Sequence, residues 1–219
     1  RAWQLPGVRA GVAIHSLRAA APASMQALAQ ALQGDDAPIH IHVAEQTAEV
    51  DDCLAATGAR PIEWLARELP LDARWQLVHA THATPQEIGA VAATGAGVVL
   101  CPGTEGNLGD GLCDLPGWLG AGVPLSLGSD SHVTRAWPEE LRWLEYGQRL
   151  ALRRRNVAAD ACTQPATAGR LWQRLQDGGR RAAGFAQWGL EVGARADLLV
   201  VNTQDDALRG DRKSTRLNS

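Results

Sequence analysis

Short apolar segments alternate with helical segments along most of the chain, and this alternation limits the possible folds more than any other feature. The five predicted strands lie at residues 8–15, 38–43, 75–80, 95–101 and 123–128. Several, such as GAGVVL and VPLSLG, are apolar without strict alternation, which is typical of parallel strands covered on both faces. Strand–helix alternation of this kind predicts an α/β fold.

Helical patterns follow four of these strands, at residues 23–32, 48–56, 61–68, 85–93 and 138–153. The start of the fourth is clearly signalled, because Thr84 can cap, Pro85 suits the first helical position and Glu87 completes a capping box. Gly95 suits the exit from that helix. Five strands are too few for a closed eight-stranded barrel, which takes roughly 200 residues or more. The sequence therefore predicts either an open doubly wound sheet or a barrel whose first strands are absent.

Composition excludes several classes of partner. Hydrophobic residues make up 45% of the 219 residues, and the net charge is -3. A nearly neutral chain offers no bulk attraction to nucleic acid or anionic membrane, and no apolar run approaches the roughly 20 residues of a membrane span. The four cysteines are scattered without a CxxC pair, which predicts reduced thiols and a cytoplasmic protein.

The end of the second predicted strand carries the most informative motif, PIHIHVAE at residues 38–45. Alternate side chains of a strand share a face, so His40 and His42 point one way and the apolar residues between them the other. His42 lies nearest the carboxyl end, where α/β enzymes place their chemistry, and Glu45 can reach the same edge. Imidazole binds zinc or iron, and a nearby carboxylate can transfer protons. The alternative is a hydrogen-bonded histidine pair in a core.

Two further strand ends carry residues of the same chemistry. His79 closes the third predicted strand, and Asp130 follows the fifth. Each alone is more often an ordinary loop or capping residue. Because the carboxyl ends of parallel strands meet at one edge, the three strand ends together predict a single cation site.

The first predicted strand and a glycine-rich segment leave alternatives open. His15 would face the same edge, and Arg18 has a planar fork that suits a carboxylate, although a solvated arginine at a helix start is equally typical. The segment TEGNLGDG at residues 104–111 lacks the Lys-Ser/Thr pair of a phosphate loop, which disfavours nucleotide binding. It is predicted to be a loop, either touching substrate or forming a simple turn.

HxHxxE at one strand end, His at the next and Ser-Asp at the last resemble the motifs of the amidohydrolase superfamily of metal-dependent (β/α)8 barrels. The segments HVAEQTAEVDDC, LVHATHATPQE, TEGNLGDG, GSDSH and EELRWLEYGQRL are similar to the formimidoylglutamate deiminases of histidine degradation, a branch of that family. The resemblance implies barrel strands four to eight in residues 1–180. It also implies a returning piece of a small β-sandwich domain in residues 181–208, with a strand at 198–201. Residues 209–219, which include DRKSTRLNS, are predicted to be a non-native disordered tail.

The resemblance implies one divalent metal, zinc or iron, and a role for each residue near it. His42 and Asp130 correspond to metal ligands, and Asp130 also takes a proton from the metal-bound water. Glu45 corresponds to the acid/base that protonates the imine nitrogen. His79 corresponds to the histidine that orients the water or polarises the substrate.

His15 and Arg18 resemble the residues that hold the glutamate part of the substrate. No role is carried over to His40, His82 or His132. The implied reaction is hydrolysis of N-formimino-L-glutamate to N-formyl-L-glutamate and ammonia, in an enzyme that is a homodimer when whole. The family also needs a His-x-His from its first strand, and none precedes residue 8. We therefore expect this chain alone to bind metal weakly and to be inactive. The alternatives are a guanine- or triazine-type amidohydrolase and a non-catalytic truncated product.

Overall fold

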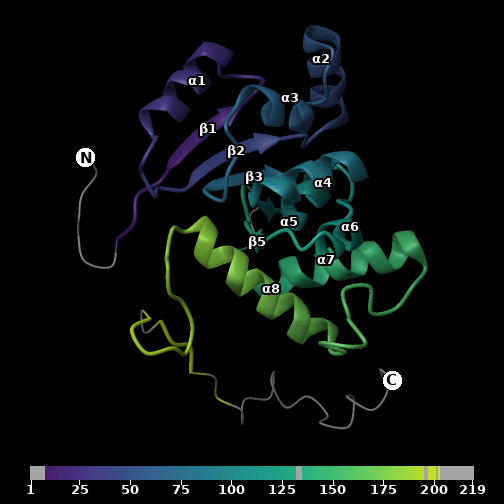
Figure 1. Ribbon diagram of the computed structural model, residues 1–219. Coiled ribbons are helices and arrows are strands. Elements are labelled where there is room, and N and C mark those ends of the chain that lie inside the picture. The colour runs from purple at the N-terminus through teal and green to yellow at the C-terminus, as the bar shows by residue number, and fades with distance from the viewer. Residues whose placement is uncertain (1–7, 132–134, 195–196, 201, 203–219) are drawn as a thin grey trace.

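Five parallel strands form one sheet, in the order β1-β2-β3-β4-β5 (Figure 1). The computed structural model describes residues 8–131, 135–194, 197–200 and 202. The strands are β1 (Val12–Ser16), β2 (Ile39–Val43), β3 (Trp75–His79), β4 (Gly97–Leu100) and β5 (Leu125–Leu127). All five predicted strands are confirmed, with β1 beginning at Val12 rather than at residue 8. A parallel sheet with crossover helices is the arrangement expected for part of a (β/α)8 barrel.

The helices lie between successive strands and after the last one. They are α1 (Pro22–Ala31), α2 (Thr47–Thr57), α3 (Pro61–Glu68), α4 (Pro85–Thr94), α5 (Pro102–Leu108), α6 (Leu115–Gly120), α7 (Trp137–Leu152) and α8 (Thr167–Ala182). The predicted start of α4 is confirmed: the Thr84 hydroxyl accepts the Glu87 N–H at 3.2 Å, and the Glu87 carboxylate accepts the Thr84 N–H at 2.9 Å. Gly95 ends the helix with a left-handed φ of 77°.

The two faces of the sheet bury different sets of side chains. Ile41, Val43 and Leu77 are fully buried in the main hydrophobic cluster, which the helices cover. The opposite face carries a smaller separate cluster of Val78, Val99 and Cys101. Every residue of β3 and β4 is buried, as predicted for parallel strands covered on both sides. The alternation of faces in β2 is confirmed, because Ile41 is buried while His42 on the other face is partly exposed.

Three helices were not predicted. The glycine-rich segment expected to be a loop instead forms α5 as far as Leu108, because Pro102 occupies the first turn and the Glu105 side chain accepts the Cys101 N–H at 3.1 Å. The short α6 also has a proline in its first turn and is capped by Asp114. Helix α8 buries Leu171, Leu175 and Gly178, a spacing that places them on one helical face.

Helix α8 covers the outer edge of β5. The β4–β5 ladder uses Val98 N–H to Pro124 C=O and Gly128 N–H to Leu100 C=O, so the backbone groups of Leu125 face away from β4. Gly178 lies against them: a Cβ there would be 1.8 Å from the Leu125 carbonyl oxygen and 2.8 Å from its nitrogen. The helix therefore occupies the side of β5 where a further strand would pair.

Beyond α8 the structure differs from one expectation. A strand was predicted at 198–201, but Leu198, Leu199 and Val200 are exposed and form no strand. Among the described residues no neighbouring strand is available to pair with them, and an unpaired strand leaves its backbone groups without partners. The predicted tail, like His132, lies outside the described residues. The domain division at residues 180 and 208 stays a prediction.

Candidate functional site

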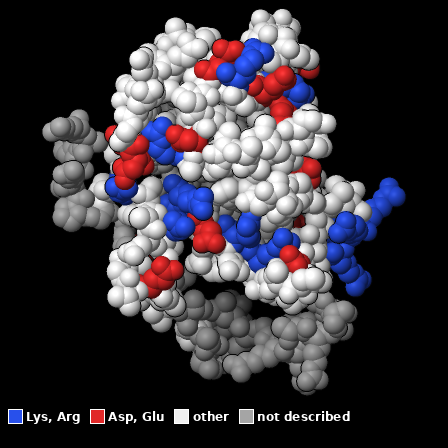
Figure 2. Space-filling model, in the orientation of Figure 1, with Lys and Arg blue, Asp and Glu red and all other residues white. Residues whose placement is uncertain are grey.

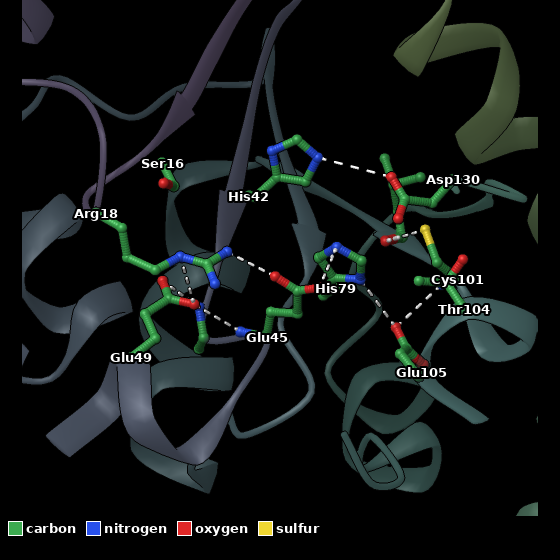
Figure 3. A network of polar contacts seen from close by, with 12 residues as sticks. Ser16, Arg18, His42, Glu45, Glu49, His79, Cys101, Thr104, Glu105 and Asp130 are labelled. Carbon is green, nitrogen blue, oxygen red and sulfur yellow. Dashed lines mark hydrogen bonds and ion pairs between the residues drawn. The ribbon is translucent and has the colours of Figure 1, made fainter. Parts of the chain in front are cut away.

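The carboxyl ends of β2, β3 and β5 bring His42, His79 and Asp130 together (Figure 3). Each offers one ligand atom, and the three atoms lie within 4.8 Å of one another. His42 Nε2 is 3.8 Å from Asp130 Oδ1, less than the distance of about 4.2 Å that separates two ligands on opposite sides of one zinc ion. The donor types and this spacing therefore fit a single divalent cation.

The imidazole of His42 is oriented by the backbone of β1. Its Nδ1 donates to the His15 carbonyl at 2.7 Å, which leaves Nε2 facing Asp130. Proteins usually fix a metal-ligating histidine in this way, through a hydrogen bond from the ring nitrogen that does not bind the metal. The His42 and His79 rings stack with centroids 5.5 Å apart.

Glu45 lies between Arg18 and His79. The Arg18 guanidinium donates to Glu45 Oε2 at 2.6 Å, and Glu45 Oε1 is 3.6 Å from His79 Nε2. The Glu45 side chain is 10% exposed, whereas that of Arg18 is 36% exposed. The predicted substrate anchor and the predicted acid/base are thus paired with each other, with the arginine on the solvent side.

A second carboxylate, Glu49 in α2, holds this pair in place. Its two oxygens accept the N–H groups of Ala44 and Glu45, both at 3.0 Å, and one lies 3.9 Å from Arg18 Nε. Ala44 has a left-handed φ of 49°, a conformation that persists only where its surroundings fix it. Sequence reasoning missed Glu49, and its spacing of four residues from Glu45 is the one signal that pointed to it.

His79 is buried at the end of β3. Its Nδ1 lies 3.4 Å from Glu105 Oε1. Burial favours the neutral ring, but the contact with Glu105 and the charges of Glu45, Glu105 and Asp130 outweigh it and raise the pKa of His79 above its ordinary value. Both His79 and Asp130 have left-handed φ values, 69° and 49°, which indicates local strain at the two strand ends.

The remaining histidines named in the sequence analysis take different positions. The His15 ring lies 5.4 Å from that of His42, at the same edge of the sheet. His40 Nε2 donates to the Ala182 carbonyl of α8 at 2.8 Å, so it joins elements rather than the site. The His82 carbonyl accepts a hydrogen bond from Arg60. All four cysteines are free thiols, as predicted, and Cys101 and Cys113 are buried.

The molecular surface carries mixed charge. On the face shown in Figure 2, charged side chains form separate groups on a mostly uncharged surface, and acidic and basic side chains lie next to one another in several of these groups. This face shows no continuous basic field of the kind that binds nucleic acid. In the described part of the chain, no helix is long and apolar enough to cross a membrane.

The sequence model of the amidohydrolase family matches residues 4–217. The chain belongs to the amidohydrolase family. It is 47% identical over 209 residues to a formimidoylglutamate deiminase from Pseudomonas aeruginosa, covering 95% of this chain and 46% of that protein. The predicted family membership and α/β class are confirmed.

Two solved structures extend the comparison. The crystal structure of an amidohydrolase from Brucella melitensis is 46% identical, with a TM-score of 0.80 over 85% of this chain and 41% of that one. An adenosine deaminase from Xanthomonas campestris with bound zinc is 29% identical, with a TM-score of 0.69 over 80% of this chain and 38% of that one. The chain thus spans less than half the length of these relatives.

Proposed function

We propose that this chain carries the hydrolytic half of a metal-dependent active site that deiminates N-formimino-L-glutamate to N-formyl-L-glutamate and ammonia. The observation that carries the proposal is the convergence of His42, His79 and Asp130 beside the Arg18–Glu45 pair. The similarity to the deiminase from Pseudomonas aeruginosa supports the choice of substrate. A cytoplasmic location and a homodimeric whole enzyme remain predictions of the same hypothesis.

The metal would be held by His42 and Asp130. The position of His79 within the same cluster makes it a candidate third donor. Three protein ligands are the usual number for catalytic zinc, and the zinc in the Xanthomonas relative favours zinc over iron. A divalent metal at this position supplies hydroxide near neutral pH by lowering the pKa of a water molecule.

The side chains of the site account for the remaining proton transfers. Asp130 would accept the proton that the attacking water loses; its carboxylate lies 3.8 Å from Nε2 of His42, the other residue that would hold the metal. The water oxygen bonds to the formimino carbon and the C=N bond becomes single. Glu45 in its protonated form gives a proton to the nitrogen, and the proton held by Asp130 follows it. The C–N bond then breaks and ammonia leaves, while the remaining hydroxyl proton passes to Glu45, which restores both carboxyl groups and leaves N-formyl-L-glutamate.

Arg18 gives this site its preference for an acidic substrate. Its guanidinium is partly exposed and already binds one carboxylate, that of Glu45, at 2.6 Å. A substrate carboxylate offers the same geometry. When it binds Arg18 in place of Glu45, the Glu45 carboxyl is released toward the reacting nitrogen, so substrate binding and proton delivery are linked.

The test joins this chain to the part of the Pseudomonas aeruginosa deiminase that precedes the matched segment. The purified chimera, loaded with zinc, is assayed for ammonia release from N-formimino-L-glutamate, beside the 219-residue chain alone. We expect activity from the chimera and weak metal binding without activity from the chain alone. A folded, zinc-loaded chimera that is inert on this substrate but deaminates a purine or a triazine would refute the substrate assignment.

The Arg18→Ala substitution in the same chimera tests the anchor. A hydrogen bond to a charged group contributes roughly 1.5–3 kcal/mol, so KM for N-formimino-L-glutamate should rise about 10- to 100-fold. Arg67→Ala is the control, because Arg67 pairs only with the adjacent Glu68 at the surface among the ion pairs of the described residues. An unchanged KM in Arg18→Ala would show that Arg18 does not hold the substrate.

A further inference from the structure

Glu105 is a buried carboxylate that no predicted role accounts for. It lies in the first turn of α5, directly after β4, and its side chain is 4% exposed. Its Oε1 accepts the Cys101 N–H at 3.1 Å and lies 3.4 Å from His79 Nδ1 (Figure 3). The carboxylate therefore contacts the ring of His79 from the side opposite to Glu45.

The ring of His79 is thus placed between two carboxylates. Glu105 faces Nδ1 at 3.4 Å, and Glu45 faces Nε2 at 3.6 Å. An ionised carboxylate can only accept hydrogen bonds, and a neutral imidazole has a single N–H to give. In the neutral ring, only one of the two glutamates can receive that proton.

Three observations favour Glu105 as the acceptor. It is closer to the ring than Glu45 and less exposed, at 4% against 10%. Glu45 already has a cationic partner in Arg18 at 2.6 Å, whereas the ion pairs found among the described residues give Glu105 only the His79 ring. A buried charge without compensation is costly. A proton on Nδ1 therefore stabilises the buried Glu105 carboxylate, whereas Glu45 is already stabilised by Arg18.

We propose that Glu105 is a positioning residue that holds the neutral ring of His79 with its proton on Nδ1, so that the unprotonated Nε2 faces the reacting groups. A bare Nε2 can bind a cation or accept a proton, and a protonated one can do neither. The catalytic consequence rests on the proposed function, but the placement of the proton does not.

The surrounding backbone fixes both members of this contact. His79 has its left-handed φ of 69°, and the next residue, Ala80, donates its N–H to the Val43 carbonyl of β2 at 3.0 Å. The neighbour of Glu105, Thr104, donates its hydroxyl to the Ser129 carbonyl at 2.8 Å. The first turn of α5 therefore connects His79 with the segment that carries Asp130.

The test is the tautomer of His79, read from nitrogen-15 correlation spectra of the histidine-labelled 219-residue chain without metal, at alkaline pH where the ring is neutral. The His79 signals are assigned from their loss in His79→Gln. We expect Nδ1 to resonate as a protonated nitrogen and Nε2 as an unprotonated one. In Glu105→Gln the side-chain amide can donate to Nδ1, so the fraction of the Nδ1–H form should fall. A wild-type ring protonated on Nε2, or a tautomer unchanged in Glu105→Gln, would overturn the proposal.

Glu140→Gln is the matched control. The Glu140 carboxylate is also buried and accepts the Gly103 N–H at 2.7 Å in the same helix, α5, yet among the described contacts it has none with His79. Glu140→Gln should lower the free energy of unfolding, as Glu105→Gln does, and leave the His79 tautomer unchanged. A tautomer that shifts equally in both variants would show that Glu105 acts only by stabilising α5.

Zinc titration of the chain gives a second readout that does not depend on substrate. Replacing a residue that orients a ligating histidine typically weakens metal binding 10- to 100-fold. We expect such a loss in Glu105→Gln and none in Glu140→Gln. If the tautomer is as proposed but the chimera does not hydrolyse N-formimino-L-glutamate, the proposed function fails and the role of Glu105 stands.

Discussion

Gly178→Ala tests whether α8 packs directly on the backbone of β5. A Cβ at this position would lie 1.8 Å from the Leu125 carbonyl oxygen, whereas such contacts are essentially never shorter than 3.0 Å. The helix would have to move by about 1.2 Å, the difference between these two distances. Overpacking of a core costs typically 1–3 kcal/mol, and we expect the upper end because a backbone carbonyl cannot rotate away.

Gly179→Ala is the natural control, since the neighbouring glycine has nothing within 4 Å of its Cβ position. Both variants gain the same helix propensity, about 1 kcal/mol, so their difference isolates the overlap. In urea unfolding, Gly179→Ala should be stabilised and Gly178→Ala should be less stable than it by roughly 3 kcal/mol. The corresponding difference in Tm is roughly 2–4 °C per kcal/mol. Equal free energies of unfolding for the two variants would mean that α8 does not lie on β5.

Two further substitutions test polar contacts. Glu49→Gln keeps the shape of the side chain but loses one of two charge-assisted hydrogen bonds to the backbone of Ala44 and Glu45, so the free energy of unfolding should fall by roughly 1.5–3 kcal/mol. The control Glu68→Gln, at a partly exposed position in a surface ion pair with Arg67, should change little, and equal losses would argue against the role of Glu49. The N–H groups of Cys162 and Thr163 lower the pKa of Asp160, so this carboxylate stabilises the fold above its unfolded pKa and loses that effect as the pH falls through its folded pKa. The difference in unfolding free energy between wild type and Asp160→Asn should therefore be constant above about pH 5 and shrink below about pH 4; a constant difference down to about pH 2 would contradict this.

The sequence predicted the elements whose determinants are local. The five strands are apolar runs with clear ends, and α4 has its cap, its proline and its terminal glycine within eleven residues of one another. The convergence of His42, His79 and Asp130 was also predictable, because parallel strands end at the same edge of a sheet. These residues lie 88 positions apart in the chain, from 42 to 130, and topology alone brings them together.

The sequence did not predict what depends on the exact path of the backbone. Glu49 and Glu105 resemble ordinary helical glutamates, and their importance comes from the N–H groups that they meet, those of Ala44 and Cys101 among them. Helix α5 was not predicted because it contains two glycines, Gly103 and Gly106, and glycine disfavours a helix. The pairing of Arg18 with Glu45 was not predictable for a related reason, because the two residues lie 27 positions apart and only the path of the backbone brings their side chains together.

The position of α8 makes the two margins of the sheet unequal. Any extended segment that joins beside Leu125 must first displace the helix from Gly178, whereas β1 is the other edge strand and pairs only with β2 among the strands of the described residues. Further strands can thus be added readily at the β1 edge only. Closing the sheet into a barrel would require α8 to leave the β5 edge. The last step of assembling a continuous cylinder would then be a competition between a helix and a strand for the same row of backbone groups.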